Sequence, residues 1–212
     1  MIKNKKPIIL IHGYSDNPST IWWRVLEKRL IQVGYSPSMI KKIDLSKNEM
    51  LGEAIFSPKI YVKKIVKKVK KMEEKSDYEK FDIIAHSMGG LISRLFIENY
   101  SGDKYIRKLI TLGTPHQGTK FTILLKFTSG GQDMIPQSDL IKQLKTSKIP
   151  KNVEYYSIFS RGDYAIIPYS NGRLNKEKRE DITNIRFKKY PHIMLVWSKK
   201  VFEEGILYAL KD

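Results

Sequence analysis

Short apolar runs and amphipathic stretches alternate along the whole chain, and this alternation restricts the fold more than any other feature. The apolar runs predict strands, whereas the stretches between them carry apolar residues at helical spacing. We expect strands at 6–13, 39–45, 81–87, 105–113, 153–160 and 181–187, and helices at 17–34, 59–75, 88–100 and 194–210. Such alternation predicts an α/β fold with about six mostly parallel strands, right-handed crossovers and helices on both faces.

One stretch interrupts this alternation. Between residues 114 and 150, Gly, Pro and Ser cluster around short apolar pieces, with a short helix expected over 138–145. An excursion of this length is often a cap or a binding loop. The whole chain has 212 residues, which is enough for one α/β domain and too few for two comfortable ones. We therefore expect a single domain over 1–212, with a small cap or lid insertion around 117–150.

Composition excludes several classes of protein. The chain has no cysteine, which excludes disulfides, thiolate metal sites and cysteine nucleophiles. No apolar run approaches the roughly 20 residues that span a bilayer. Only about five apolar residues precede His12, too few for a secretory signal, so we assign this segment to the first strand. The sequence leaves two cellular locations for the protein: we expect the cytoplasm if the chain is complete, and secretion if a signal was removed.

The formal net charge of +17 is unusually high, and much of this positive charge lies in the segment Lys59–Lys75. Apolar residues recur there at helical spacing, with lysines on the opposite face. A surface helix with solvated lysines is the simplest interpretation, and a patch attracted to anionic lipid or nucleic acid is the alternative. No aromatic platform or recognition helix accompanies it, so we expect no nucleic-acid partner. Peripheral contact with an anionic membrane stays open.

The stretch IIAHSMGGLI, over 83–92, combines the end of a strand with the start of a helix, and Ser87 lies between them. A serine hydroxyl becomes a useful nucleophile when it is exposed on a tight turn, beside a base and near backbone N–H groups. The pattern small-x-Ser-x-Gly, here AHSMG over 85–89, provides that exposure because larger residues would clash in the turn. A tight turn without catalysis is the simpler alternative.

Two backbone N–H groups must hold an oxyanion beside such a serine. One is expected from Met88, the residue after the nucleophile, and the other from the loop after the first strand. In that loop Gly13 permits a close backbone approach, and Tyr14 offers its amide. For His12 we favour a structural role, with its ring bonded to the loop backbone.

Six segments together resemble the lipases and esterases of the α/β-hydrolase superfamily, in the right order and over nearly the whole chain. They are IILIHGYSDNPSTIWW, FDIIAHSMGGLISRLFI, KLITLGTPHQGT, DMIPQSDLIKQL, YSIFSRGDYAIIP and YPHIMLV. The chain is most similar to the small compact bacterial lipases with an Ala-His-Ser-Met-Gly elbow, and similar in part to triacylglycerol lipases that share Gly-Thr-Pro-His-x-Gly. The resemblance implies a minimal α/β-hydrolase fold, although the excursion is longer than in the compact lipases.

The resemblance also implies a chain order of nucleophile, acid and histidine. His192 follows the last strand, where hydrolases of this fold carry their base. His116 follows the fourth strand, and in lipases with this segment it is a structural loop residue. The alternatives are His116 as the base, and His192 as a helix-capping residue packed under Trp197.

For the acid we favour Asp163, which directly follows the fifth expected strand. A carboxylate there can accept a hydrogen bond from Nδ1–H of His192, which leaves Nε2 facing Ser87. Asp133, within the excursion, is the second candidate.

These assignments predict a serine hydrolase that cleaves carboxylic esters of aliphatic acyl chains through an acyl-enzyme, with no cofactor and no metal. Its partner would be a hydrophobic ester or lipid substrate. An acyltransferase or membrane-lipid deacylase with the same triad is one alternative, and a non-catalytic relative that binds a ligand is another. Residues expected near the catalytic end, as an apolar acyl pocket, are Trp22, Phe121, Tyr164 and Ile166.

Overall fold

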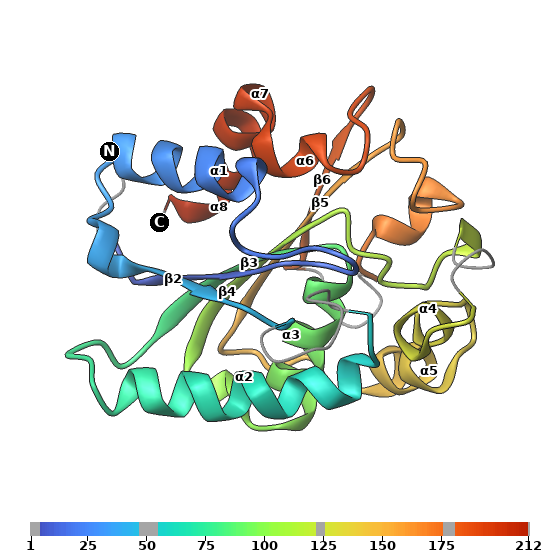
Figure 1. Ribbon diagram of the computed structural model, residues 1–212, viewed down its shortest axis with the longest axis horizontal. Coiled ribbons are helices and arrows are strands. Elements are labelled where there is room, and N and C mark those ends of the chain that lie inside the picture. Colours follow the sequence, from blue (N-terminus) through green and yellow to red (C-terminus); the bar gives the residue numbers. More distant parts are fainter. Residues whose placement is uncertain (1–4, 47–54, 122–125, 176–180, 212) are drawn as a thin grey trace.

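A central sheet of parallel strands organises the computed structural model, which describes residues 5–46, 55–121, 126–175 and 181–211 (Figure 1). Within these ranges the strands are β1 (Ile8–Ile11), β2 (Ile40–Ile43), β3 (Phe81–His86), β4 (Ile106–Leu112), β5 (Glu154–Ser160) and β6 (Thr183–Phe187). They lie in the order β2-β1-β3-β4-β5-β6, and every neighbouring pair is parallel. The predicted α/β class and the six expected strands are confirmed.

Helices cover both faces of this sheet (Figure 1). The helices are α1 (Ile21–Gln32), α2 (Pro58–Glu73), α3 (Met88–Asn99), α4 (Ser129–Asp133), α5 (Asp139–Thr146), α6 (Met194–Trp197), α7 (Lys199–Val201) and α8 (Leu207–Leu210). Shorter turns occupy Pro37–Met39, Gly102–Lys104 and Tyr169–Gly172, and a π-helical turn spans Phe202–Ile206. In Figure 1, α1 and the C-terminal helices lie on one face of the sheet, and α2 and α3 lie on the other.

The strands are apolar on both sides because both faces are covered. Successive side chains of a strand point to opposite faces of its sheet. Accordingly, Ile8 and Leu10 of β1 belong to the core cluster under α1, whereas Ile9 and Ile11 belong to the cluster under α2 and α3. This explains why the sequence shows continuous apolar runs rather than alternation, as is usual for buried parallel strands.

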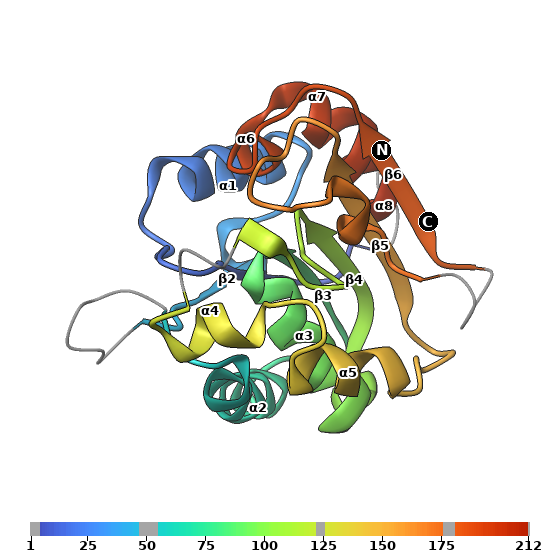
Figure 2. The same cartoon turned by 90° about the vertical axis from the view of Figure 1, so that its right-hand side faces the viewer.

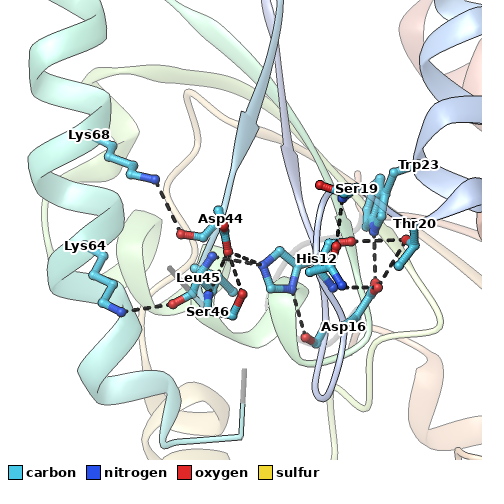
Figure 3. Close-up of polar contacts among 12 residues, drawn as sticks. His12, Asp16, Ser19, Thr20, Trp23, Asp44, Leu45, Ser46, Lys64 and Lys68 are labelled. Atoms are coloured by element: carbon cyan, nitrogen blue, oxygen red, sulfur yellow. Dashed lines mark hydrogen bonds and ion pairs between the residues drawn. The ribbon is translucent and has the colours of Figure 1, made fainter. Parts of the chain in front are cut away.

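The lysine-rich helix α2 has the predicted amphipathic form. Ser57 caps its N-terminus, with Oγ accepting from Lys59 N at 3.2 Å, and its apolar face is buried against the core. Two of its lysines are not simply solvated: Lys64 Nζ donates to the carbonyl of Leu45 at 2.9 Å, and Lys68 Nζ donates to that of Asp44 at 3.4 Å (Figure 3). These lysines fasten the segment after β2 to the helix.

The C-terminal helix predicted over 194–210 is not continuous, and this expectation was wrong. Ser198 has an extended backbone, with φ −66° and ψ 131°, and it separates α6 from α7. Its hydroxyl accepts a hydrogen bond from Val201 N at 3.4 Å, because serine satisfies the free amides of a helix N-terminus. A buried lysine of β4, Lys108, then donates to the carbonyls of Ala209 and Lys211, each at 3.1 Å, at the other end of this region.

The excursion predicted around 117–150 contains α4 and α5 in its described part. Figure 2 shows α5 beside α3, and Arg94 of α3 donates to the carbonyl of Leu144 in α5 at 2.8 Å. At the other side, Gly130 N donates to the carbonyl of Ile55 at 3.1 Å. The single domain and the lid remain predictions. None of the helices in the described ranges is both long and apolar enough to cross a membrane.

The strand order places a topological switch point at the carboxyl edge of the sheet. From β1 the chain moves outward to β2 and then crosses back to β3 on the other side of β1. Where connections leave neighbouring parallel strands in opposite directions, loops separate and ligands bind between them. The segment His12–Tyr14 follows β1, and Ser87 follows β3, so both border this switch point.

Candidate active site

Ser87 lies on a strained turn between β3 and α3. Its backbone has φ 53° and ψ −128°, a region that residues with a side chain rarely occupy. Its neighbours hold this conformation: Ser87 N donates to the carbonyl of Leu112 at 2.9 Å, and Thr114 Oγ1 donates to the carbonyl of Ser87 at 3.0 Å. The hydroxyl is therefore carried on a fixed turn.

Glycines allow the elbow and the first loop to pack directly against each other. A Cβ added to Gly13 would lie 2.7 Å from the Cβ of Ser87, and one added to Gly89 would lie 2.4 Å from the carbonyl oxygen of His12. These distances are shorter than any van der Waals contact, so larger residues would separate the two loops. The requirement for small residues that the sequence pattern predicted therefore has a direct steric cause at Gly89.

Asp163 and His192 form a close pair. Asp163 Oδ2 lies 2.8 Å from His192 Nδ1, and Asp163 Oδ1 accepts from Ala165 N at 2.9 Å. The carboxylate is buried, whereas the imidazole side chain is 23% exposed. Because a carboxylate only accepts, Nδ1 carries the proton in this pair, and Nε2 of a neutral His192 has a free lone pair. Gly113 leaves space for both, since a Cβ there would lie 3.0 Å from Asp163 Oδ2.

His86 connects this pair to the serine turn. It immediately precedes Ser87, and its ring centroid lies 4.5 Å from that of His192. Its Nε2 lies 3.3 Å from the carbonyl oxygen of His192. Burial lowers the pKa of His86 well below its ordinary value, with a smaller lowering from His192, so the ring stays neutral and Nε2–H donates. The residue next to the serine thus contacts both the ring and the backbone of His192.

The structure brings Asp163 and His192 together, with Ser87 on the adjoining turn. Within the described contacts the Ser87 hydroxyl makes no hydrogen bond to His192. Such contacts are often long in proteins without substrate and tighten when it binds.

The two backbone amides expected to hold an oxyanion make no hydrogen bond to the protein within the described residues. Met88 is the first residue of α3, and Tyr14 directly follows Gly13. Among the hydrogen bonds of the described residues, neither the Met88 amide nor the Tyr14 amide donates to a protein acceptor. The Tyr14 hydroxyl lies 2.9 Å from Thr128 Oγ1, which ties the first loop to the N-cap of α4.

His12 has the structural role that the sequence favoured. Figure 3 shows its ring between two backbone segments: Nδ1 donates to the carbonyl of Gly13 at 3.1 Å, and Nε2 accepts from Leu45 N at 2.9 Å. Burial lowers its pKa, which agrees with a neutral ring that both donates and accepts. His12 therefore joins the loop after β1 to the segment after β2.

The alternative base and acid have other partners. His116 Nε2 lies 3.0 Å from Thr111 Oγ1, and His116 is paired with no carboxylate in the described part of the chain. Asp133 accepts a hydrogen bond from the hydroxyl of Ser57, at the start of α2. Neither alternative is joined to a second triad candidate.

The residues predicted to line an acyl pocket differ in exposure. Phe121 and Tyr164 are 38% and 75% exposed, whereas Ile166 is buried. Trp22 is half-buried, and its indole Nε1 donates to Asp16 Oδ2 at 3.2 Å. Their role in binding remains a prediction.

The sequence does not predict the contacts of two residues at the site, Asp16 and His86. Asp16 is buried and accepts from both Trp22 and Trp23, the second at 2.9 Å (Figure 3), and it thereby fixes the loop that carries Tyr14. For His86 the only sequence signal is its place directly before the candidate nucleophile. For Asp16 the sequence offered only its place near two tryptophans.

A parallel sheet with helices on both faces, with a strained turn at Ser87 and an Asp–His pair at its edge, has the architecture of the α/β-hydrolase fold. The chain belongs to the palmitoyl protein thioesterase family, whose model matches residues 7–196. The predicted membership of the α/β-hydrolase superfamily is confirmed. Family and fold together support a carboxylic ester hydrolase of the lipase and esterase type.

Solved structures share this fold at low sequence identity. A mature lipase from Bacillus licheniformis is 16% identical, with a TM-score of 0.75, and the match covers 100% of this chain and 95% of that one. A monoacylglycerol lipase from Paleococcus ferrophilus is 15% identical, with a TM-score of 0.69, over 95% of this chain and 91% of that one. Triacylglycerol lipase 2 from Saccharomyces cerevisiae is 46% identical over 55 residues, which are 26% of this chain and 17% of that protein.

Proposed function

We propose that this chain cleaves carboxylic esters of aliphatic acyl chains, with Ser87 as nucleophile, His192 as base and Asp163 as its acid partner. The 2.8 Å contact between Asp163 and His192, at the sheet edge where the strained turn presents Ser87, is the observation that carries the proposal. A buried carboxylate holds the imidazole in the tautomer that leaves Nε2 as a proton acceptor.

The first half of the reaction forms an acyl-enzyme. His192 Nε2 takes the proton of Ser87 as Oγ attacks the acyl carbonyl carbon, and the carbonyl oxygen becomes an oxyanion. His192 then gives that proton to the leaving alcohol, while the bond between the acyl carbon and the alcohol oxygen breaks. The product is an ester of Ser87.

The second half repeats these steps with water. His192 takes a proton from water, whose oxygen attacks the acyl carbon of the Ser87 ester. The proton then returns to Ser87 Oγ as the acyl–serine bond breaks and the carboxylic acid leaves.

The oxyanion would be held by the amides of Tyr14 and Met88. Both are uncommitted in the described structure, so they can donate without first breaking a protein hydrogen bond. Met88 also lies at the N-terminus of α3, where the helix dipole favours negative charge. One such donor typically contributes about 3 kcal/mol to transition-state stabilisation.

A thioester is the second candidate substrate class, favoured by the family match over residues 7–196. The same attack on an acyl carbonyl would apply, with a thiol leaving in place of the alcohol. Trp22, Phe121, Tyr164 and Ile166 remain the candidates for contacts with an aliphatic chain. A transfer to an acceptor alcohol would give the new ester instead of free acid, and product analysis with added alcohol distinguishes the two.

The exposed lysines of α2 support peripheral contact with anionic lipid. The helix exposes Lys59, Lys63, Lys67, Lys70 and Lys71 along its solvent face. Such attraction is electrostatic and is screened by salt. Binding to vesicles that contain phosphatidylserine should therefore fall between low and high salt, and salt-independent binding would contradict this contact.

Hydrolysis of p-nitrophenyl esters of increasing acyl length, beside an acyl thioester, tests the reaction. We expect Ser87→Ala to lower kcat at least about 10⁴-fold, because the nucleophile is lost. Ser38→Ala removes a serine that is exposed on the turn Pro37–Met39, and it should retain the wild-type rate. Full activity of Ser87→Ala would contradict the proposal.

A further inference from the structure

A cavity of about 360 Å³ lies between α3 and the segment 136–149, away from the candidate catalytic residues. Its apolar wall is formed by Ile141, Leu144, Ile149 and Leu174, and two polar side chains, Arg94 and His116, also line it. This volume is within the range of about 300–1,000 Å³ that is usual for small-molecule sites. None of Ser87, Asp163 and His192 lines the cavity.

The cavity and the Asp–His pair lie on different sides of the sheet. Ile141 and Leu144 belong to the core cluster under α2 and α3. Leu195, whose side chain contacts the Gly113 site beside His192, belongs to the cluster under α1. A ligand in this cavity would therefore not border the Asp–His pair.

Arg94 offers unused donors at this cavity. Its side chain is buried, and its Nε and Nη2 bind the carboxylate of Glu98 at 2.7 and 3.0 Å. Nη2 also donates to the carbonyl of Leu144 at 2.8 Å. Among the described residues no acceptor contacts Nη1, so two of the five N–H groups of the guanidinium are uncommitted.

His116 offers an unused acceptor. The hydroxyl of Thr111 lies 3.2 Å from the carbonyl oxygen of Tyr156 and 3.0 Å from His116 Nε2. When the hydroxyl donates to the carbonyl, its oxygen accepts from Nε2–H of a neutral His116, and Nδ1 is a bare acceptor. That Nδ1 is buried and has no hydrogen-bond partner within the described residues. Burial lowers the pKa of His116 well below its usual range, and the charge of Arg94 lowers it further.

We propose that this cavity binds an aliphatic carboxylate, which takes up one proton from solvent on binding. One carboxyl oxygen then accepts from Arg94 Nη1, and the other carries the proton that it donates to His116 Nδ1. A protonated carboxyl group has an acceptor oxygen for the unused N–H groups of Arg94 and, beside it, a donor for the unused acceptor of His116. The aliphatic chain replaces water along the apolar wall. This site goes beyond the proposed hydrolysis and does not depend on it.

Charge at the cavity favours an acid over a base. Glu98 neutralises Arg94 but does not line the cavity, and the lining side chains within the described ranges include no carboxylate. Lys142 and Lys145 line it and are exposed. Lysines in this position raise the local concentration of anions.

Isothermal titration calorimetry of the full chain with octanoate, octanamide and octan-1-ol tests the site. Octanoate and octanamide each supply a carbonyl oxygen for Arg94 and a second polar atom for His116 Nδ1, whereas the single hydroxyl oxygen of octan-1-ol would have to serve both. We expect octan-1-ol to bind at least about tenfold more weakly than octanoate, as for the loss of a charge-assisted hydrogen bond. Equal affinities for octanoate and octan-1-ol, or no binding of octanoate, would overturn the proposal.

Variants locate the binding within the chain. Ile141→Trp fills the cavity and should lower octanoate affinity at least about tenfold, and Leu174→Phe fills it from the other side if the first variant fails to melt cooperatively. Lys145→Glu should weaken binding severalfold, whereas Lys148→Glu, the same change at an exposed lysine that does not line the cavity, should leave it unchanged. Wild-type affinity in both filled variants, or equal affinities of the two lysine variants, would show that octanoate binds elsewhere.

Discussion

Two histidines that follow strands of the sheet, His116 after β4 and His192 after β6, have contrasting partners. His192 is held through Nδ1 by a buried carboxylate, and its ring is partly exposed at the carboxyl edge of the sheet. His116 is held through Nε2 by the hydroxyl of Thr111, and it is fully enclosed. A buried carboxylate beside an imidazole is the arrangement expected of a candidate base. Burial and the charge of Arg94 lower the pKa of His116 and keep its ring neutral. The partner of the imidazole, rather than its place after a strand, separates a candidate base from a binding group.

The largest effect on kcat should come from a substitution of Asp163, the carboxylate that pairs with His192. Asp163→Asn keeps the shape of the pair but can donate to Nδ1, which favours the wrong tautomer of His192. We expect kcat for ester hydrolysis to fall about 10⁴-fold. Asp133→Asn alters the second acid candidate, whose partner is Ser57, and should keep kcat within about threefold. A similar loss of kcat in Asp163→Asn and Asp133→Asn would contradict the assignment of Asp163 as the acid partner of His192.

A smaller loss should follow when the contact behind His192 is removed. His86→Phe retains a ring beside His192 but loses the 3.3 Å hydrogen bond to its carbonyl. We expect kcat to fall about tenfold with little change in KM, because one hydrogen bond positions the base. Thr111→Val removes the corresponding partner of His116, and it should lower thermal stability without lowering kcat. An unchanged kcat in His86→Phe would show that His86 does not position the base.

The enclosed histidines should make folding sensitive to mild acid. His116 and His86 have lowered pKa values in the folded chain, so below about pH 6.5 the unfolded chain binds more protons than the folded one. Their contribution to stability is therefore complete above this pH and decreases as the pH falls. When the pH is lowered from 7.5 to 5.5, the free energy of unfolding should fall by about 1.4 kcal/mol for each of these two histidines.

Urea unfolding at the two pH values measures this change. His116→Phe should lose about half of the pH dependence that the two histidines share, whereas substitution of the exposed Lys148 by Glu should preserve it. An identical pH dependence in His116→Phe and the wild type would show that His116 is not held neutral by the fold.

Local patterns predicted much of the fold. The apolar runs gave all six described strands, because strands covered on both faces must be apolar throughout. At Ser198 the apolar spacing continues, but a side-chain cap interrupts the helix that the spacing predicts. Spacing reports which residues face the core, and it does not report where a hydroxyl competes for backbone amides.

Less of the candidate site than of the fold could be predicted from the sequence. The places of Ser87, Asp163 and His192 at strand ends could be predicted, since carboxyl ends of parallel strands meet at one edge. The contact of His86 with His192 and the cavity beside Arg94 could not, because they join residues about fifty to a hundred positions apart in the chain. Only the packed chain shows which buried polar atoms have lost their partners.

The double contact of Asp16 gives the molecule an internal optical probe. Two of the three tryptophans, Trp22 and Trp23, donate their indole N–H groups to this one carboxylate, on the loop that also bears Tyr14. A nearby negative charge alters indole emission, so displacement of that loop would change the fluorescence spectrum without any added dye. Stopped-flow mixing with an ester could therefore follow the loop in real time through the emission of these two rings.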